Sequence, residues 1–356
     1  MNNKMNYLTE KQIHELEKKS YGIAGHSAVQ ICEWNKKAIL NKGVCYKEKF
    51  YDAHCHKCMQ FTPISLWCDN NCIFCWRPME YMDFSSIKNI NWQKPEEFVN
   101  ELIEKRIKLL SGFGGNDKAD KQKWKDAQLP DHYAISLSGE PTLYPYLPEL
   151  VQYLKKEKNA RTIFIVSNGN NPEMILKLKE QNALPGQLYI SMNASNEKLF
   201  TEITRSNRPD AWERFNKSLS LLKDLECRTV IRMTLIKGLS MKDKFLQKYA
   251  KLIEDAQSDF VEVKAYMHIG MSRQRLNMGA MPYHEEIKDY TNKLIKLLPK
   301  YHIEDEQIES RIVLLMRNDF TERYFMDENR KITAARKRIA SGNYLTEKQA
   351  KKTLGL

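Results

Sequence analysis

Three closely spaced cysteines are the part of the sequence best suited to chemistry. Cys68, Cys72 and Cys75 lie in the segment CDNNCIFC, so three thiols fall within eight residues. Three cysteine ligands can hold three irons of a four-iron cluster and leave the fourth iron open. A structural zinc site more often pairs two C-x2-C halves. The spacing therefore predicts a 4Fe-4S cluster with one open iron.

The spacing C-x3-C-x2-C resembles the signature of the radical S-adenosylmethionine (SAM) superfamily. Phe74 fits the aromatic position before the last cysteine of that signature. The resemblance implies that the open iron chelates the amino and carboxylate groups of SAM and passes an electron to its sulfonium. It also implies that the chain is an enzyme.

Four further cysteines precede this segment. Cys32, Cys45 and Cys58 follow one another at intervals of 13 residues, and Cys55 interrupts the series. Seven of the eight cysteines thus lie between positions 32 and 75, which is more typical of metal or redox chemistry than of disulfides in a cytoplasmic chain. The segment DAHCHKC (52–58) also suits a zinc knuckle. Spacing alone leaves zinc and an iron–sulfur cluster open here.

Six repeated βα units are predicted to position these cysteines. Short runs of β-branched and aromatic residues alternate with amphipathic helical stretches, as in a parallel sheet. Right-handed crossovers curl such a series into a barrel. We therefore predict an α/β fold of the radical SAM type, an open (βα)6 partial TIM barrel. The strands are expected at Gln60–Trp67, His132–Leu137, Thr162–Val166, Gln187–Met192, Thr229–Ile236 and Phe260–Met267.

The helices of these units follow their strands. The first is expected behind Pro95, and a glycine- and lysine-rich stretch after it, Ser111–Pro130, is predicted to be a long loop. The later helices are expected at Leu147–Lys156, Pro172–Gln181, Ala211–Leu225, Met241–Ala256 and Tyr283–Leu298.

Polar residues recur at the ends of the predicted strands, where a barrel of this kind places its active site. The segment SGEPT (138–142) resembles the superfamily loop for the SAM amino group. Ordinary turn chemistry is the alternative for any one such position. The residues predicted to contact SAM are Glu140, Asn168, Ser191, Asn193 and Arg232.

The six cysteines together resemble the two-cluster arrangement of archaeal tRNA 4-demethylwyosine synthases. The similarity includes GHSAVQICEW (25–34), GVCYKEKFY (43–51), SLSGEPTLYP (136–145) and MSRQRLNMG (271–279). It implies that Cys32, Cys45 and Cys58 hold a second, auxiliary 4Fe-4S cluster. Cys55 departs from the pattern as an extra thiol. No flavodoxin-like domain is present, so an external one-electron donor such as ferredoxin or flavodoxin is expected.

The resemblance implies a reaction on a tRNA for phenylalanine that carries N1-methylguanosine beside the anticodon. A 5′-deoxyadenosyl radical takes hydrogen from the N1-methyl group, and pyruvate donates two carbons that close a third ring. Lys47 matches a family lysine that forms a Schiff base with pyruvate or neutralises its carboxylate. A Schiff base requires a lowered lysine pKa. Pyruvate could instead chelate the auxiliary cluster.

Two parts of the sequence are candidates for tRNA contact. The guanine must leave its stack to expose its methyl group, so aromatic and arginine side chains are expected near the barrel mouth. Candidates are Trp76, Tyr266, Arg273 and Arg275. The segment from Asn329 to Leu356 contains eight Lys and Arg residues and one acidic residue, which suits phosphate binding by a helical basic tail. A solvated surface is the alternative for this tail.

Composition and patterning set the remaining expectations. The 356 residues carry a formal charge of +12, and the charged N-terminal stretch contains no apolar run, so a cytoplasmic monomer without a membrane segment is expected. The predicted domains are a cysteine-rich extension over 1–59, the barrel over 60–300 and a C-terminal extension over 301–356. Two other functions remain open: a two-cluster radical SAM enzyme acting on a peptide or small metabolite, and a non-catalytic zinc-dependent RNA-binding protein.

Overall fold

Six parallel strands form the centre of the molecule, as the alternating pattern predicts. The computed structural model describes residues 8–78, 81 and 90–324. Neighbouring strands along the chain are neighbours in the sheet, and each pair is parallel. The six strands are β3 (Cys58–Thr62), β4 (His132–Ile135), β5 (Thr162–Ser167), β6 (Gln187–Ser191), β7 (Arg228–Leu235) and β8 (Phe260–Ala265).

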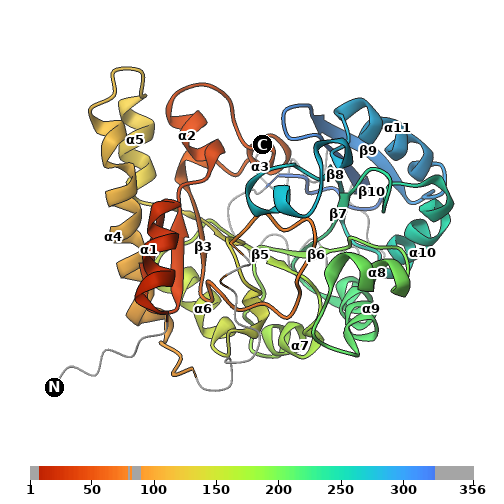
Figure 1. Ribbon diagram of the computed structural model, residues 1–356, viewed down its shortest axis with the longest axis horizontal. Coiled ribbons are helices and arrows are strands. Elements are labelled where there is room, and N and C mark those ends of the chain that lie inside the picture. The colour runs from red at the N-terminus through yellow and green to blue at the C-terminus, as the bar shows by residue number, and fades with distance from the viewer. Residues whose placement is uncertain (1–7, 79–80, 82–89, 325–356) are drawn as a thin grey trace.

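The sheet is open rather than closed into a ring. Its order in the described part of the chain is β1-β2-β3-β4-β5-β6-β7-β8-β10-β9, with edges at β1 and β9. The helices that follow β3 lie around the outside of the curved sheet (Figure 1). The open barrel prediction is therefore confirmed. The outer helices are α4 (Pro95–Gly114), α5 (Lys121–Gln128), α6 (Leu147–Glu157), α7 (Pro172–Glu180), α8 (Glu197–Thr204), α9 (Ala211–Leu221), α10 (Leu246–Ala256) and α11 (His284–Ile295).

The prediction of a long loop over Ser111–Pro130 is wrong. Helix α4 continues to Gly114, and α5 forms a separate helix beside it (Figure 1). Asp120 caps α5 by accepting hydrogen bonds from the next turn, and the Trp124 indole donates to the carbonyl of Leu110 at 3.0 Å. These contacts stabilise a helix that was not predicted because its composition is rich in lysine. The first strand is also shorter than predicted, since β3 ends at Thr62, before a proline that has no N–H to donate.

Two antiparallel hairpins extend the sheet at either side, and neither was predicted. Strands β1 (Tyr21–Ala24) and β2 (Ser27–Gln30) pair with each other, and β2 pairs with β3. At the other side, β9 (Tyr301–Gln307) pairs with β10 (Ile312–Arg317), which pairs with β8. The predicted basic tail from Asn329 lies outside the described residues.

Three short helices belong to the N-terminal segment: α1 (Glu10–Lys18), α2 (Glu33–Ile39) and α3 (Tyr46–Tyr51). Helix α3 packs inside the curve of the sheet, not outside it. Its residues Tyr46, Phe50 and Tyr51 are buried in one cluster with Phe164 of β5, Tyr189 of β6, Val230 of β7 and Phe260 of β8. No helix in the described part of the chain is long and apolar enough to cross a membrane.

Candidate active site

A cavity of about 200 Å³ opens where β3, β4, β5 and β6 end. All three cysteines of the CDNNCIFC segment line it. Four of the five predicted SAM contacts line the same cavity, because the carboxyl ends of parallel strands share one edge. These four residues are Glu140, Asn168, Ser191 and Asn193.

Glu140 organises two of the loops around this cavity. Its carboxylate accepts hydrogen bonds from the Asn168 N–H at 2.7 Å, the Ser167 hydroxyl at 2.8 Å and the Thr142 hydroxyl at 2.6 Å. Burial, reinforced by the charge of Asp69, raises the pKa of Glu140 to about 7. The side chain therefore joins the loop after β4 to the end of β5.

The cavity wall fits a cluster with bound SAM in both its donors and its backbone. Burial raises the pKa of the Cys68 and Cys72 thiols well above the usual value, so a metal must displace their protons. Gly139 has φ of +70°, and a Cβ there would lie 2.0 Å from the carbonyl oxygen of Ile64. In the described part of the chain, the buried Asn193 Oδ1 has no hydrogen-bond partner. A polar ligand can supply that partner.

The loop that follows β8 braces the cysteine loop. Arg275 donates from Nε to the Ile73 carbonyl at 3.2 Å and from Nη2 to the Cys75 carbonyl. The Met271 N–H donates to the Trp76 carbonyl at 3.2 Å. Gly270 approaches that same carbonyl so closely that a Cβ would lie 2.3 Å from it.

The four predicted tRNA contacts therefore differ in their surroundings. Trp76 is 42% exposed and Arg273 is exposed, so both present a surface to a large substrate. Tyr266 is 1% exposed, and its hydroxyl donates to Ser272 at 3.0 Å. Arg275 holds backbone carbonyls. Of these four residues, Trp76 and Arg273 are the exposed ones.

The cysteines of the second group lie at the starts of α2, α3 and β3 and interact electrostatically with one another. Cys32 and Cys45 are the residues that precede α2 and α3, and Cys58 begins β3. Burial and the proximity of Cys32 raise the pKa of both Cys45 and Cys58 to about 12. In the described residues, no three His, Cys, Asp or Glu side chains are grouped as ligands of one metal ion.

Asn35 and Arg106 support this cysteine group, and the sequence analysis missed both. The Asn35 amide donates to the carbonyls of Cys55, His56 and Cys58 at 2.8, 3.0 and 3.2 Å. Arg106 is fully buried and donates to the His56 carbonyl at 3.1 Å. The charge of this buried guanidinium interacts favourably with Cys58 and Cys32 when they are thiolates. The signal was an arginine on the apolar face of α4.

Cys55 is used within this segment in a different way. Its sulfur accepts a hydrogen bond from the Cys45 N–H at 3.4 Å and lies 3.7 Å from the Trp34 carbonyl, to which it donates. Its backbone N–H donates to Glu48 at 2.7 Å. The extra thiol therefore contributes to the local backbone network.

Lys47 lies on α3, inside the curve of the sheet. Its Nζ is 4.0 Å from the ring centre of Phe164 and 4.7 Å from that of Tyr189. Burial, reinforced by the charge of Arg232, lowers the pKa of Lys47 to about 8. A lysine in this setting releases its proton far more readily than one on the surface.

Arg232 is near Lys47 and is not among the residues that line the cavity described above. Its Nε donates to Glu262 at 2.8 Å, and its Nη2 donates to the Tyr46 hydroxyl at 2.6 Å. Glu262 is fully buried and also accepts from the Tyr51 hydroxyl at 3.0 Å. Arg232 thus belongs to the surroundings of Lys47 in this structure.

The cavity and Lys47 lie on the same face of the sheet. Val166 and Ser191 line the cavity, and Phe164 and Tyr189, two residues earlier on β5 and β6, contact Lys47. Side chains two positions apart on a strand share a face and are about 7 Å apart. The Lys47 amine is therefore one layer of side chains below the cavity.

Two family models match the chain. Residues 62–249 match the radical SAM superfamily, and residues 255–317 match a family described as wyosine base formation. The first match contains β4 to β7 and the cysteine loop of the cavity. The second contains β8, α11 and the hairpin β9–β10.

Proteins of known name are similar over most of the chain. The SAM-dependent tRNA 4-demethylwyosine synthase of Pyrococcus abyssi is 46% identical over 313 residues, which are 88% of this chain and 90% of that protein. The synthase of Methanocaldococcus jannaschii is 40% identical over 324 residues, or 89% of this chain and 96% of that protein.

Two solved structures are similar in fold and sequence. A structure of TYW1 with a lysine-pyruvate adduct bound has a TM-score of 0.78 and 36% identity, and the match covers 88% of this chain and 98% of that one. A crystal structure of archaeal TYW1 has a TM-score of 0.72 and 32% identity, covering 89% and 99%.

Proposed function

The chain belongs to the family of SAM-dependent tRNA 4-demethylwyosine synthases within the radical SAM superfamily, and from this premise we propose that it joins pyruvate to N1-methylguanosine of a tRNA for phenylalanine. The observation that carries this proposal is the placement of Lys47 directly below the cavity of Cys68, Cys72 and Cys75, on one face of the sheet.

Cys68, Cys72 and Cys75 would hold the cluster to which SAM binds. The bound pair supplies a 5′-deoxyadenosyl radical that takes a hydrogen atom from the N1-methyl group of the base. Glu140, through Asn168 and Ser167, fixes the cavity wall, and the unpaired Asn193 Oδ1 would accept a hydrogen bond from the bound SAM. These residues orient the reactants and exclude water.

Lys47 would hold pyruvate. Its neutral amine adds to the keto carbon, and water leaves to give an imine that retains the carboxylate. The aromatic rings of Phe164 and Tyr189 desolvate the amine, and the Arg232 guanidinium, ion-paired with Glu262, lies over the Tyr189 ring. A lysine–pyruvate adduct is bound in the TYW1 structure that resembles this chain, which supports this role.

Cys32, Cys45 and Cys58 would hold an auxiliary 4Fe-4S cluster next to Lys47. Helix α3 carries both residues, since Cys45 is its N-cap residue and Lys47 is its second residue. An external one-electron donor, such as ferredoxin or flavodoxin, would reduce the enzyme, and the protein would act as a cytoplasmic monomer. Trp76 and Arg273 would receive the flipped base at the mouth.

Anaerobic turnover tests the proposed function. Reconstituted protein is incubated with reductant, SAM, pyruvate and tRNA that carries N1-methylguanosine, and the nucleosides are then analysed by mass spectrometry. The tricyclic base is expected only in the complete mixture, and tRNA with unmethylated guanosine is the matched control. Protein that contains zinc without sulfide, and forms no tricyclic base, would overturn the proposal.

A further inference from the structure

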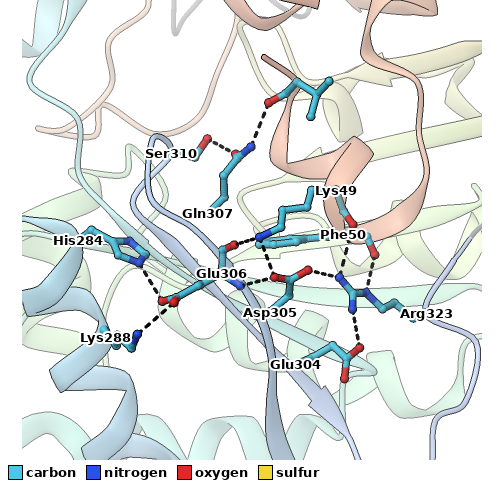
Figure 2. A network of polar contacts seen from close by, with 11 residues as sticks. Lys49, Phe50, His284, Lys288, Glu304, Asp305, Glu306, Gln307, Ser310 and Arg323 are labelled. Carbon is cyan, nitrogen blue, oxygen red and sulfur yellow. Dashed lines mark hydrogen bonds and ion pairs between the residues drawn. The ribbon is translucent and has the colours of Figure 1, made fainter. Parts of the chain in front are cut away.

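The hairpin β9–β10 and the residues after it contact the residues just before α3 and the second half of the helix. Gln307 donates to the Val44 carbonyl at 3.0 Å, just before the helix. Lys49 donates from Nζ to the Glu306 carbonyl at 2.5 Å. Arg323 donates to the Phe50 carbonyl at 3.1 Å, at the end of the helix. Figure 2 shows these contacts converging on one side of α3.

Helix α3 needs such support because it has only six residues. Helices this short are not stable by themselves in water. The last carbonyls of any helix have no partner within the helix. Here the Arg323 guanidinium satisfies two of them, Phe50 at 3.1 Å from Nε and Lys49 at 3.4 Å from Nη2. A cation at this end also complements the helix dipole.

Arg323 is itself fixed by carboxylates of β9. Its Nη1 pairs with Glu304 at 2.7 Å, and its Nη2 pairs with Asp305. Asp305 also pairs with Lys49 at 2.9 Å, so one carboxylate joins the arginine to the side chain of α3. The side chains of Arg323 and Asp305 are only 16% and 19% exposed. A shared, shielded network of this kind contributes more than an isolated surface pair.

We infer that Arg323 is a positioning residue that sets the place of Lys47 and Cys45 through α3. The inference rests on the proposed function, in which Lys47 binds pyruvate. Lys47 is in the first turn of α3, between the Val44 contact and the two carbonyls held by Arg323. Misplacement of a reacting group by about 1 Å can lower a rate on the order of 100-fold. Lysine cannot replace the arginine fully, because its single ammonium lacks the planar fork.

Reductive trapping of pyruvate on Lys47 measures this positioning. The imine forms with loss of water, and added borohydride delivers a hydride to the imine carbon, which leaves a stable secondary amine on Lys47. Peptide mass spectrometry follows its formation at several pyruvate concentrations. The reconstituted proteins compared are wild type, Arg323→Ala, Arg323→Lys and the control Arg317→Ala.

Arg317 is a matched control because it also bonds carboxylates at the end of this hairpin. Its side chain contacts Asp319 at 2.5 Å, Asp259 at 3.5 Å and the Gln257 carbonyl, none of which belongs to α3. Arg323→Ala should lower the trapping rate at saturating pyruvate about tenfold or more, and Arg323→Lys should restore part of it. Arg317→Ala should trap at the wild-type rate. Equal rates for Arg323→Ala and wild type, or an equal loss in Arg317→Ala, would overturn the inference.

A second readout separates this inference from the proposed function. Failure of wild-type protein to trap pyruvate would count against the role of Lys47 itself. The electron paramagnetic resonance signal of the reduced cluster at Cys45 then decides the positioning role. Arg323→Ala should shift this signal while Arg317→Ala leaves it unchanged. An unshifted signal in Arg323→Ala would reject the positioning role.

Discussion

Arg275 donates a hydrogen bond from Nη2 to the backbone carbonyl of Cys75, although 200 positions separate the two residues in the chain. Its Nε donates to the Ile73 carbonyl at 3.2 Å. The loop after β8 thereby holds the loop of the cysteines that line the cavity. The sequence predicted that Arg275 contacts the tRNA, whereas in the structure its guanidinium donates hydrogen bonds within the protein.

Replacement of Arg275 by alanine should impair SAM cleavage more than tRNA binding. The change removes two hydrogen bonds from a charged donor, each worth roughly 1.5–3 kcal/mol. We expect SAM cleavage without tRNA to fall about tenfold or more. Quantification of 5′-deoxyadenosine and a filter-binding assay with tRNA check this. Unimpaired SAM cleavage together with weakened tRNA binding would show that Arg275 acts in tRNA binding and not in support of the cysteine loop.

Cys58→Ala and Cys55→Ala should differ in iron content. Cys58 interacts electrostatically with Cys32 and Cys45, whereas the Cys55 sulfur accepts from the Cys45 N–H and donates to the Trp34 carbonyl. Cys55→Ala should keep about eight irons per chain, and Cys58→Ala should keep about four. Iron and sulfide analysis of anaerobically prepared proteins measures both. The opposite pattern would make Cys55 the ligand.

The basic tail and Arg273 should affect tRNA in different ways. Removal of the tail from Arg330 should weaken binding and reduce the slope of log affinity against log salt by roughly one unit per lost phosphate contact. Turnover at saturating tRNA should persist. Arg273→Ala should instead lower turnover of bound tRNA. If truncation changes neither affinity nor its salt slope, the tail is only a solvated surface.

The free energy of unfolding should fall in mild acid because of the buried His26. It is fully buried, and its Nε2 accepts from the Gln93 N–H at 2.9 Å, a bond that protonation would break. Burial lowers the pKa of His26 from 6.5 to about 4. Between these values the unfolded chain binds a proton that the folded chain does not, so stability is full above pH 6.5 and falls as pH decreases.

The variant His26→Asn isolates this effect. When the pH is lowered from 7 to 5, the free energy of unfolding should decrease by about 2 kcal/mol more in wild type than in the variant. Urea unfolding of both proteins at both pH values gives the difference, and effects of other groups cancel. Parallel loss of stability in the two proteins would show that His26 does not titrate in this range.

Local patterns in the sequence predicted the parts of the site that depend on local structure. The cysteine spacing and the polar residues after the strands needed only the rule that parallel strands end at one edge, and the structure brings Glu140 and Asn193 to one cavity. The packing of α3 inside the sheet could not be predicted, because it depends on contacts such as Arg323 with Phe50, 273 positions apart. The neighbours of Arg232 could not be predicted for the same reason, since its strand was predicted but not α3 beside it.

Isotope transfer from pyruvate tests the central claim most directly. Uniformly carbon-13-labelled pyruvate is supplied with SAM, reductant and methylated tRNA. The modified nucleoside is then isolated, and its mass is measured by mass spectrometry. The proposed reaction predicts a tricyclic guanosine that contains two labelled carbons, and none of this product with Lys47→Ala. A wild-type product without label, or a labelled product formed equally by Lys47→Ala, would contradict the assignment of this site to pyruvate.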